Sequence, residues 1–328
     1  MQTRKLPGCD LLIAQPQNCF SKYSFQHAAG ARNPTKILAF NIPMPWCSRY
    51  WDVATRTRRL RERYQKYKMK GRFRHVAKVM NEEQRINVCK TSLNQIYNML
   101  RTSPQDWRNY LTLARTVITH LDTTTFMQKP DRTSEQVWMI AAMQRLAFMD
   151  ADSGGVVDIA SWCLRQWLNI NQREPTSLAA LRGIGQVWLS RAQPTLAKIH
   201  RAEGHSSSST TSQLSVRSTN DSTSAAEAER RAGSSDYVEA RGFLQPATEY
   251  FERAIAAATS QQNVSGDLLA TAAEAYMSLG NTSSPRINQQ YFGRAIQLLR
   301  AATSIPGYTL SRYLQMYLDE YGKLLEEA

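Results

Sequence analysis

The chain has 328 residues, of which 42% are hydrophobic and 9% aromatic, enough apolar material for a packed core, so a wholly disordered protein is excluded. Its formal net charge is +14, but residues 1–80 hold 17 Lys and Arg against 3 Asp and Glu, whereas residues 81–328 hold 24 of each. The basic character therefore belongs to the N-terminal segment and not to the remainder of the chain.

The number and spacing of the cysteines, and the absence of long apolar runs, bear on the cellular compartment of the protein. The cysteines are odd in number and widely spaced, without a CxxC pair or a Cys/His cluster of zinc spacing: Cys9, Cys19, Cys47, Cys89 and Cys163. Reduced thiols in the cytoplasm or nucleus are the simpler interpretation. We expect neither a transmembrane span nor a secretory signal, because no long apolar run is present. The acid-poor first 50 residues are weakly compatible with a mitochondrial targeting peptide, a less favoured alternative.

Residues 1–50 show no apolar period, and we expect a poorly ordered N-terminal tail. Residues 51–80 are expected to form a basic helix, in which Leu60, Tyr64 and Tyr67 fall at helical spacing. Its basic patch comprises Arg56, Arg58, Arg59, Arg61, Arg63, Lys66, Lys68, Lys70, Arg72, Arg74 and Lys78. Three interpretations stay open: a localisation signal or solvated face, a nucleic-acid site in which aromatic rings stack on bases, or an anionic-membrane surface.

A helical-repeat body is expected to begin at residue 81, with its first half ending at residue 202. Apolar residues recur at intervals of three and four from Ile86 to Leu100 and from Trp107 to Leu121, which predicts an antiparallel helix pair. Thr133 and Gln136 have the spacing of a capping box and predict the start of a third helix. The dominant 3.6-residue period predicts an all-α protein.

The segment from Ile159 to Trp188 contains two apolar series separated by Glu174-Pro175-Thr176, where a proline ends one helix and Thr176 can cap the next. This spacing resembles the tetratricopeptide repeat (TPR). In that register Cys163 takes the small position, Trp167 the aromatic position and Pro175 the terminal proline, and Ile184-Gly185-x-x-Trp188 matches the Leu-Gly-x-x-Tyr motif. Pro194 is expected to kink or stop the second helix.

The resemblance covers about residues 156–325 and is interrupted by an insertion. Residues 203–235 are rich in Ser and Thr, and we expect a disordered insertion whose removal hardly changes stability. The pattern resumes in a second half, residues 236–328, where Ala247, Phe251 and Ala254 match a second TPR helix. A final amphipathic helix is expected to cap the array. The expected architecture is thus TPR-like antiparallel helix pairs in an irregular helical solenoid.

No sequence motif points to catalysis, a cofactor or a metal. The five histidines are scattered, and Gly183-Ile-Gly185 lacks the third glycine of a dinucleotide fingerprint. Four tryptophans are expected in the core, Trp107, Trp138, Trp167 and Trp188, whereas Trp162 is off the apolar face and is the exception. We therefore expect a protein without enzymatic activity.

The TPR resemblance implies a partner groove lined by first-helix positions that face away from the core. These positions are Arg182, Gln186, Leu189, Asp267, Glu274 and Met277. Asp267 and Glu274 disfavour a carboxylate-terminated peptide, and ordinary solvated surface is an equal alternative. We expect a protein–protein interaction adaptor or scaffold, with a nucleic-acid-associated protein as the alternative. On the groove hypothesis, Arg182→Glu alters partner binding and leaves stability almost intact.

Overall fold

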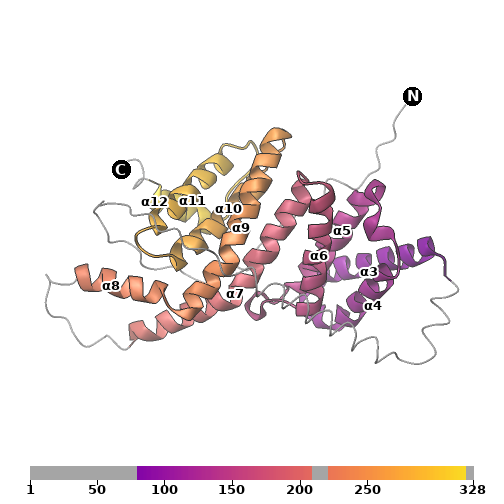
Figure 1. Ribbon diagram of the computed structural model, residues 1–328, viewed down its shortest axis with the longest axis horizontal. Coiled ribbons are helices and arrows are strands. Elements are labelled where there is room, and N and C mark those ends of the chain that lie inside the picture. The colour runs from indigo at the N-terminus through magenta and orange to yellow at the C-terminus, as the bar shows by residue number, and fades with distance from the viewer. Residues whose placement is uncertain (1–79, 209–220, 323–328) are drawn as a thin grey trace. The chain divides into compact units, whose positions relative to one another are not determined.

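The computed structural model describes residues 80–208 and 221–322, of which 83% are helical and none forms a strand (Figure 1). The predicted all-α class is therefore confirmed. The chain divides into two compact units, residues 22–85 and residues 1–21 with 86–328. The predicted tail and all but the last residue of the predicted basic helix lie outside the described residues, so the fold below is that of the larger unit.

Ten α-helices lie in the described ranges, together with short 3₁₀ segments at Pro104–Tyr110, Phe126–Gln128, Pro130–Arg132 and Ala151–Ser153. The first four are α3 (Glu82–Thr102), α4 (Leu111–Asp122), α5 (Thr133–Ala147) and α6 (Val157–Arg173). The others are α7 (Leu178–Ser208), α8 (Asp221–Ala232), α9 (Ser235–Ser260), α10 (Gly266–Thr282), α11 (Asn288–Thr303) and α12 (Arg312–Tyr321).

Four of these helices, α3, α5, α7 and α10, contact one another in that order, and we call them row A. Polar contacts join each helix of row A to the next, and every one of them links residues 39 or more positions apart. They are Lys90 Nζ to Glu135 Oε2 at 2.9 Å, Gln144 Nε2 to the Gly183 carbonyl at 3.3 Å, and the ion pair of Arg182 with Asp267.

The helices α4, α6, α9 and α11 form a second series, row B, which is connected in the same way. Its contacts are Arg115 to Asp158 at 2.8 Å, Trp162 Nε1 to Asp122 Oδ1 at 3.1 Å, Arg253 to Asn171 at 3.4 Å, and Arg294 to Glu252 at 2.8 Å. Each helix of row B follows a helix of row A in the chain, so the two rows alternate along the sequence.

Successive helices from the two rows pack antiparallel. In the largest pair, α7 and α9 lie side by side (Figure 1), and Lys198 at one end pairs with Asp236 at 2.7 Å. At the other end, Gln261 donates to the Thr176 carbonyl at 3.0 Å.

Two glycines of α7 permit the close packing. A Cβ atom at Gly183 would lie 2.5 Å from Cε2 of Trp167, and one at Gly185 would lie 3.0 Å from Cε1 of Phe251. Glycine weakens a helix by about 1 kcal/mol relative to alanine, yet here it allows an aromatic ring to sit directly on the backbone. The interior glycines therefore position α6 and α9 on opposite sides of α7.

The structure differs from the sequence expectations at the predicted insertion, residues 203–235. Helix α7 continues through Pro194 to Ser208, so the proline does not stop it, and α8 occupies Asp221–Ala232. The segment Ala225-Ala-Glu-Ala-Glu-Arg-Arg-Ala232 consists of strong helix formers, which outweigh the Ser/Thr-rich context. Within 203–235, only residues 209–220 are left outside the described part of the chain.

Candidate partner-binding face

An aromatic and cationic cluster lies at the α3–α5 contact of row A. The Arg145 guanidinium stacks 5.6 Å above the centre of the Tyr97 ring, an electrostatically favourable cation–π arrangement. Trp138 lies seven residues before Arg145 on α5, so the two side chains share one face of the helix. All three side chains are partly exposed. We call Tyr97, Trp138 and Arg145, with Arg182, Gln186 and Glu274, the row-A face.

The structure places the six predicted groove residues in two classes. Arg182, Gln186 and Glu274 are partly exposed, whereas Leu189, Asp267 and Met277 are at most 7% exposed. The expectation that all six face away from the core is therefore wrong for the last three. The reason is that α7 contacts α5, α6, α9 and α10, and α10 contacts α7, α9 and α11, which leaves each helix only a narrow open strip.

Arg182 and Asp267 form an ion pair between α7 and α10, with side chains only 16% and 10% exposed. Sequence reasoning placed both residues on the same surface, and the structure brings them together across 85 positions of chain. They bind each other, so Arg182 is engaged in holding two helices together.

A carboxyl pair lies next to this ion pair on α10. Asp267 Oδ1 is buried and finds no hydrogen-bond partner among the described residues, while the other carboxylate oxygen accepts from Arg182. Burial, reinforced by the charge of Asp267, raises the pKa of Glu274 to about 8. Burial and the nearby Glu274 charge also raise the pKa of Tyr313 on α12, to about 12. Glu274 is therefore mostly protonated at neutral pH.

A compensated carboxylate, Glu252 of α9, contacts Tyr276 on another side of α10. Burial raises the pKa of Glu252, but hydrogen bonds from Arg294 and Tyr276 outweigh this effect and hold it below the usual range. Arg294 donates to both carboxylate oxygens at 2.8 Å, a bidentate geometry that is stronger than a single contact. This cluster joins α9, α10 and α11 and is fully engaged in packing.

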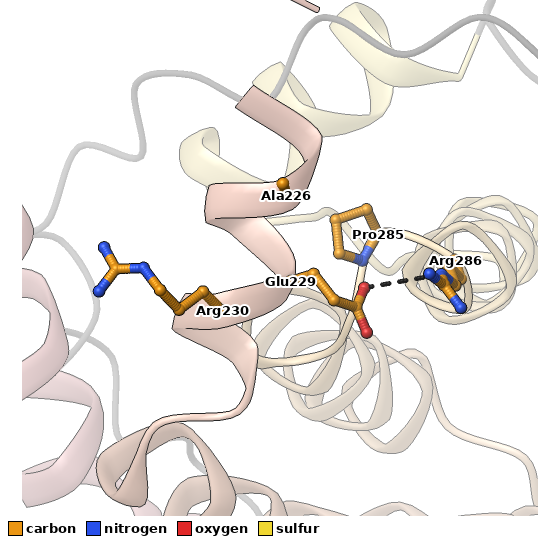
Figure 2. Close-up of a pocket in the computed structure, with 5 residues that line it drawn as sticks. All are labelled: Ala226, Glu229, Arg230, Pro285 and Arg286. Atoms are coloured by element: carbon orange, nitrogen blue, oxygen red, sulfur yellow. Dashed lines mark ion pairs between the residues drawn. The ribbon is translucent and has the colours of Figure 1, made fainter. Parts of the chain in front are cut away.

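A cavity of about 490 Å³ lies between α8 and the loop before α11 (Figure 2). It is lined by Ala226, Glu229, Arg230, Pro285 and Arg286. Glu229 points toward Arg286, 3.9 Å away, and accepts from the Ser284 hydroxyl at 2.6 Å, while Arg230 points away from them (Figure 2). The polar groups of this cavity thus hold α8 in place.

The cysteines within the described ranges, Cys89 and Cys163, are free and buried. Burial raises the pKa of the Cys89 thiol to about 11 and that of Cys163 still further, so neither is an activated nucleophile. Within residues 80–208 and 221–322, no group of three or more His, Cys, Asp or Glu side chains is arranged so that it could hold a metal ion. Within the same ranges no helix is long and apolar enough to cross a membrane.

Two tryptophans exchange the roles that the sequence predicted for them. Trp162, expected off the core, is only 2% exposed. Its indole N–H donates to Asp122 on α4 at 3.1 Å, so the polar end of the buried ring has a hydrogen-bond partner. Trp138, expected in the core, is partly exposed on the row-A face. The seven-residue spacing of Trp138 and Arg145 could have indicated their shared face, but Tyr97 is joined to them only by tertiary packing.

The basic patch from Arg56 to Lys78 lies outside the described residues. Comparison of the chain with protein-family models, with curated proteins and with solved structures finds no match.

Proposed function

We propose that the protein is a non-enzymatic protein–protein interaction adaptor or scaffold whose TPR-like helix pairs form an irregular solenoid and present the row-A face to a partner. The alternation of rows A and B supports this proposal, because helical-repeat proteins build their binding surface from one helix of each pair. Free buried thiols at Cys89 and Cys163 support a reducing compartment, the cytoplasm or nucleus.

The observation that carries the proposal is the composition of the row-A face. Trp, Tyr and Arg dominate the energetics of protein interfaces, and Trp138, Tyr97 and Arg145 lie together there without being fully buried. No partner for the Trp138 indole N–H is recorded among the described residues. An amphipathic ring that is half in the core and half in solvent is well suited to anchor a partner.

Interaction mapping with the full-length chain tests the proposal. Proteins cross-linked to the wild type are compared with those cross-linked to Trp138→Ala and to Tyr250→Ala, a partly exposed aromatic of α9 in row B that stacks with Arg253. We expect Trp138→Ala to lose specific partners that Tyr250→Ala retains, with both variants as helical as the wild type. Identical partner sets for all three proteins would contradict the proposal.

A second candidate function, nucleic-acid association through the basic patch, is supported by the separation of charge. All of the +14 net charge falls in residues 1–80, where eleven Lys and Arg lie between Arg56 and Lys78. Such a segment supplies phosphate affinity without help from the rest of the chain. The two functions are compatible, because they use different residues.

A further inference from the structure

We propose that Glu274, with Asp267 behind it, receives a cationic side chain, the Lys or Arg of a bound peptide, on the row-A face. This inference rests on the proposed adaptor function and specifies the chemistry of its partner. It follows from two independent features of α10, one accessible and one buried.

The accessible feature is the Glu274 carboxyl group. It is partly exposed, and in residues 80–208 and 221–322 no hydrogen bond or ion pair to this group is recorded. Most other carboxylates near the helix contacts are compensated, as Glu135 is by Lys90 and Arg132, and Glu252 is by Arg294. Glu274 is thus a carboxyl group within reach of a ligand and without a cation of its own.

The buried feature is Asp267 Oδ1. Asp267 is 7% exposed, and an oxygen buried without a hydrogen bond costs roughly 1–3 kcal/mol, more when it is charged. Its single cation, Arg182, is bound to the other oxygen. A second positive charge nearby would relieve this cost, because Arg182 contacts only the other oxygen and leaves Oδ1 without a donor among the described residues.

Within the described part of the chain, the surroundings of Glu274 supply no other cation. The groups that face it are Asp267 on α10, which is negatively charged, and Tyr313 on α12, which is uncharged because its pKa is raised to about 12. Arg182 on α7 is held by Asp267. Glu252 and Arg294, from α9 and α11, pair with each other and with Tyr276, two residues from Glu274 and so on another side of α10.

A side-chain cation fits this site better than a metal ion. Calcium takes roughly six to eight oxygen ligands, and the described residues bring no third carboxylate to this position. Arg and Lys need one or two carboxylate oxygens, and a guanidinium can contact a carboxylate through two parallel hydrogen bonds. A peptide lying along row A would carry such a side chain to Glu274.

Proton release is a signature of this binding mode. With a pKa of about 8, about three-quarters of the Glu274 carboxyls carry a proton at about pH 7.5. A bound cation favours the ionised form and expels that proton. Binding at an ordinary exposed carboxylate, which is already ionised, would release none.

The test uses the full-length chain and a library of seven-residue peptides with arginine fixed at the centre and the other positions varied. The matched library carries citrulline, which has nearly the same shape but no charge. We expect arginine peptides to bind about tenfold or more tightly than their citrulline twins. Calorimetry of the tightest arginine peptide in buffers of different ionisation enthalpy should show release of about 0.75 proton near pH 7.5.

Two variants assign the effect to Glu274. Glu274→Gln keeps the size and removes the acid, and we expect it to bind arginine peptides as weakly as citrulline peptides, without proton release. Glu249→Gln, an exposed position on α9, is the matched control and should behave as the wild type. Equal affinity for the two libraries, unchanged binding by Glu274→Gln, or binding without proton release would each overturn the inference. Partners lost in Trp138→Ala but kept in Glu274→Gln would leave the adaptor function standing and reject only the cationic ligand.

Discussion

Arg182 and Asp267 show how a correct surface assignment can miss the role of a residue. Helical spacing places each on the row-A side of its own helix, and this could be read from the sequence. That the two meet across 85 positions depends on the packing of α7 against α10, for which spacing carries no information. Arg182, predicted to line a partner groove, therefore joins α7 to α10.

This pair leads to a revised stability prediction. Breaking a largely buried ion pair by removing one partner leaves an uncompensated charge, so Arg182→Met should lower the free energy of unfolding by roughly 3–5 kcal/mol in urea denaturation. The double variant Arg182→Met with Asp267→Leu should recover much of that loss, because neither charge is then buried alone. Additive losses in the double variant would show that the two side chains do not interact.

The Glu274 carboxyl predicts a pH dependence of stability. Its pKa rises from about 4.5 in the unfolded chain to about 8 in the fold, so the native state binds more protons across that interval. The contribution of Glu274 to the free energy of unfolding is therefore largest below about pH 4.5. It decreases as the pH rises to about 8, by up to about 1.4 kcal/mol per pH unit.

Urea denaturation of the wild type and Glu274→Gln at several pH values checks this dependence. Other titrating groups contribute equally to both proteins, so the difference between them isolates Glu274. The variant should lack the decline between about pH 5 and 8 and gain stability relative to the wild type as the pH rises. Parallel curves would mean that Glu274 titrates normally.

Helix capping illustrates a limit of local signals. Thr133 and Gln136 have capping-box spacing, but Gln136 is buried and donates to the carbonyls of Phe126 and Lys129 at 2.7 and 2.6 Å. A reciprocal capping box does form at Asn81 and Gln84, with bonds of 3.0 and 2.8 Å. The two motifs are alike in sequence, but the Gln136 amide is used for tertiary hydrogen bonds and is not available for capping.

At the scale of the elements, the 3.6-residue period identified the long helices. It missed α8 and the 3₁₀ segment Pro104–Tyr110, which was expected to be the start of an α-helix. The sequence also predicted Thr176 as the cap of α7, whereas the helix begins at Leu178, and the Ser177 carbonyl accepts from the Leu181 N–H. Short or weakly buried elements lack the repeated apolar contacts that make a period visible.

We predict that helix α8 unfolds locally while the other described helices stay folded. It is attached by surface pairs such as Glu229 with Arg286 and Arg231 with Glu203, and by the buried methyl group of Ala232. Surface pairs contribute about 0–1 kcal/mol each. Glu227→Pro, at an exposed position in the middle of α8, should therefore melt this helix and leave α9 and α10 protected.

Hydrogen exchange measured by mass spectrometry tests this independence. Peptides from α8 should lose protection in Glu227→Pro and keep it in Glu227→Ala, which retains the backbone N–H. The free energy of global unfolding should change by no more than about 1–2 kcal/mol. Loss of protection throughout α9 would mean that α8 is an integral part of the body.

At the scale of the whole molecule, the net charge is unevenly distributed along the chain. Residues 81–328 have no net charge, and the +14 lies before them. Any affinity for nucleic acid should therefore fall steeply with salt, with a log–log slope of about −0.9 per duplex phosphate contacted. Titration of a labelled duplex with the full-length chain at several salt concentrations measures this slope.

Removal of residues 1–80 should abolish that affinity. A truncated chain that binds nucleic acid as tightly as the full-length chain would place the phosphate contacts elsewhere. The absence of salt-sensitive binding by the full-length chain would instead leave the basic patch as a localisation signal, a membrane-surface helix or a solvated face.

The glycines that receive aromatic rings have a consequence for how this sequence can change in evolution. Gly183 faces Trp167, Gly185 faces Phe251, Gly280 faces Phe292 and Gly266 faces Tyr308, and a methyl group at any of them would meet the ring. Alanine at such a site should be accepted only after its ring has been replaced by a smaller side chain, since overpacking costs roughly 1–3 kcal/mol. Among descendants of this sequence, these four pairs should therefore be inherited together or exchanged together.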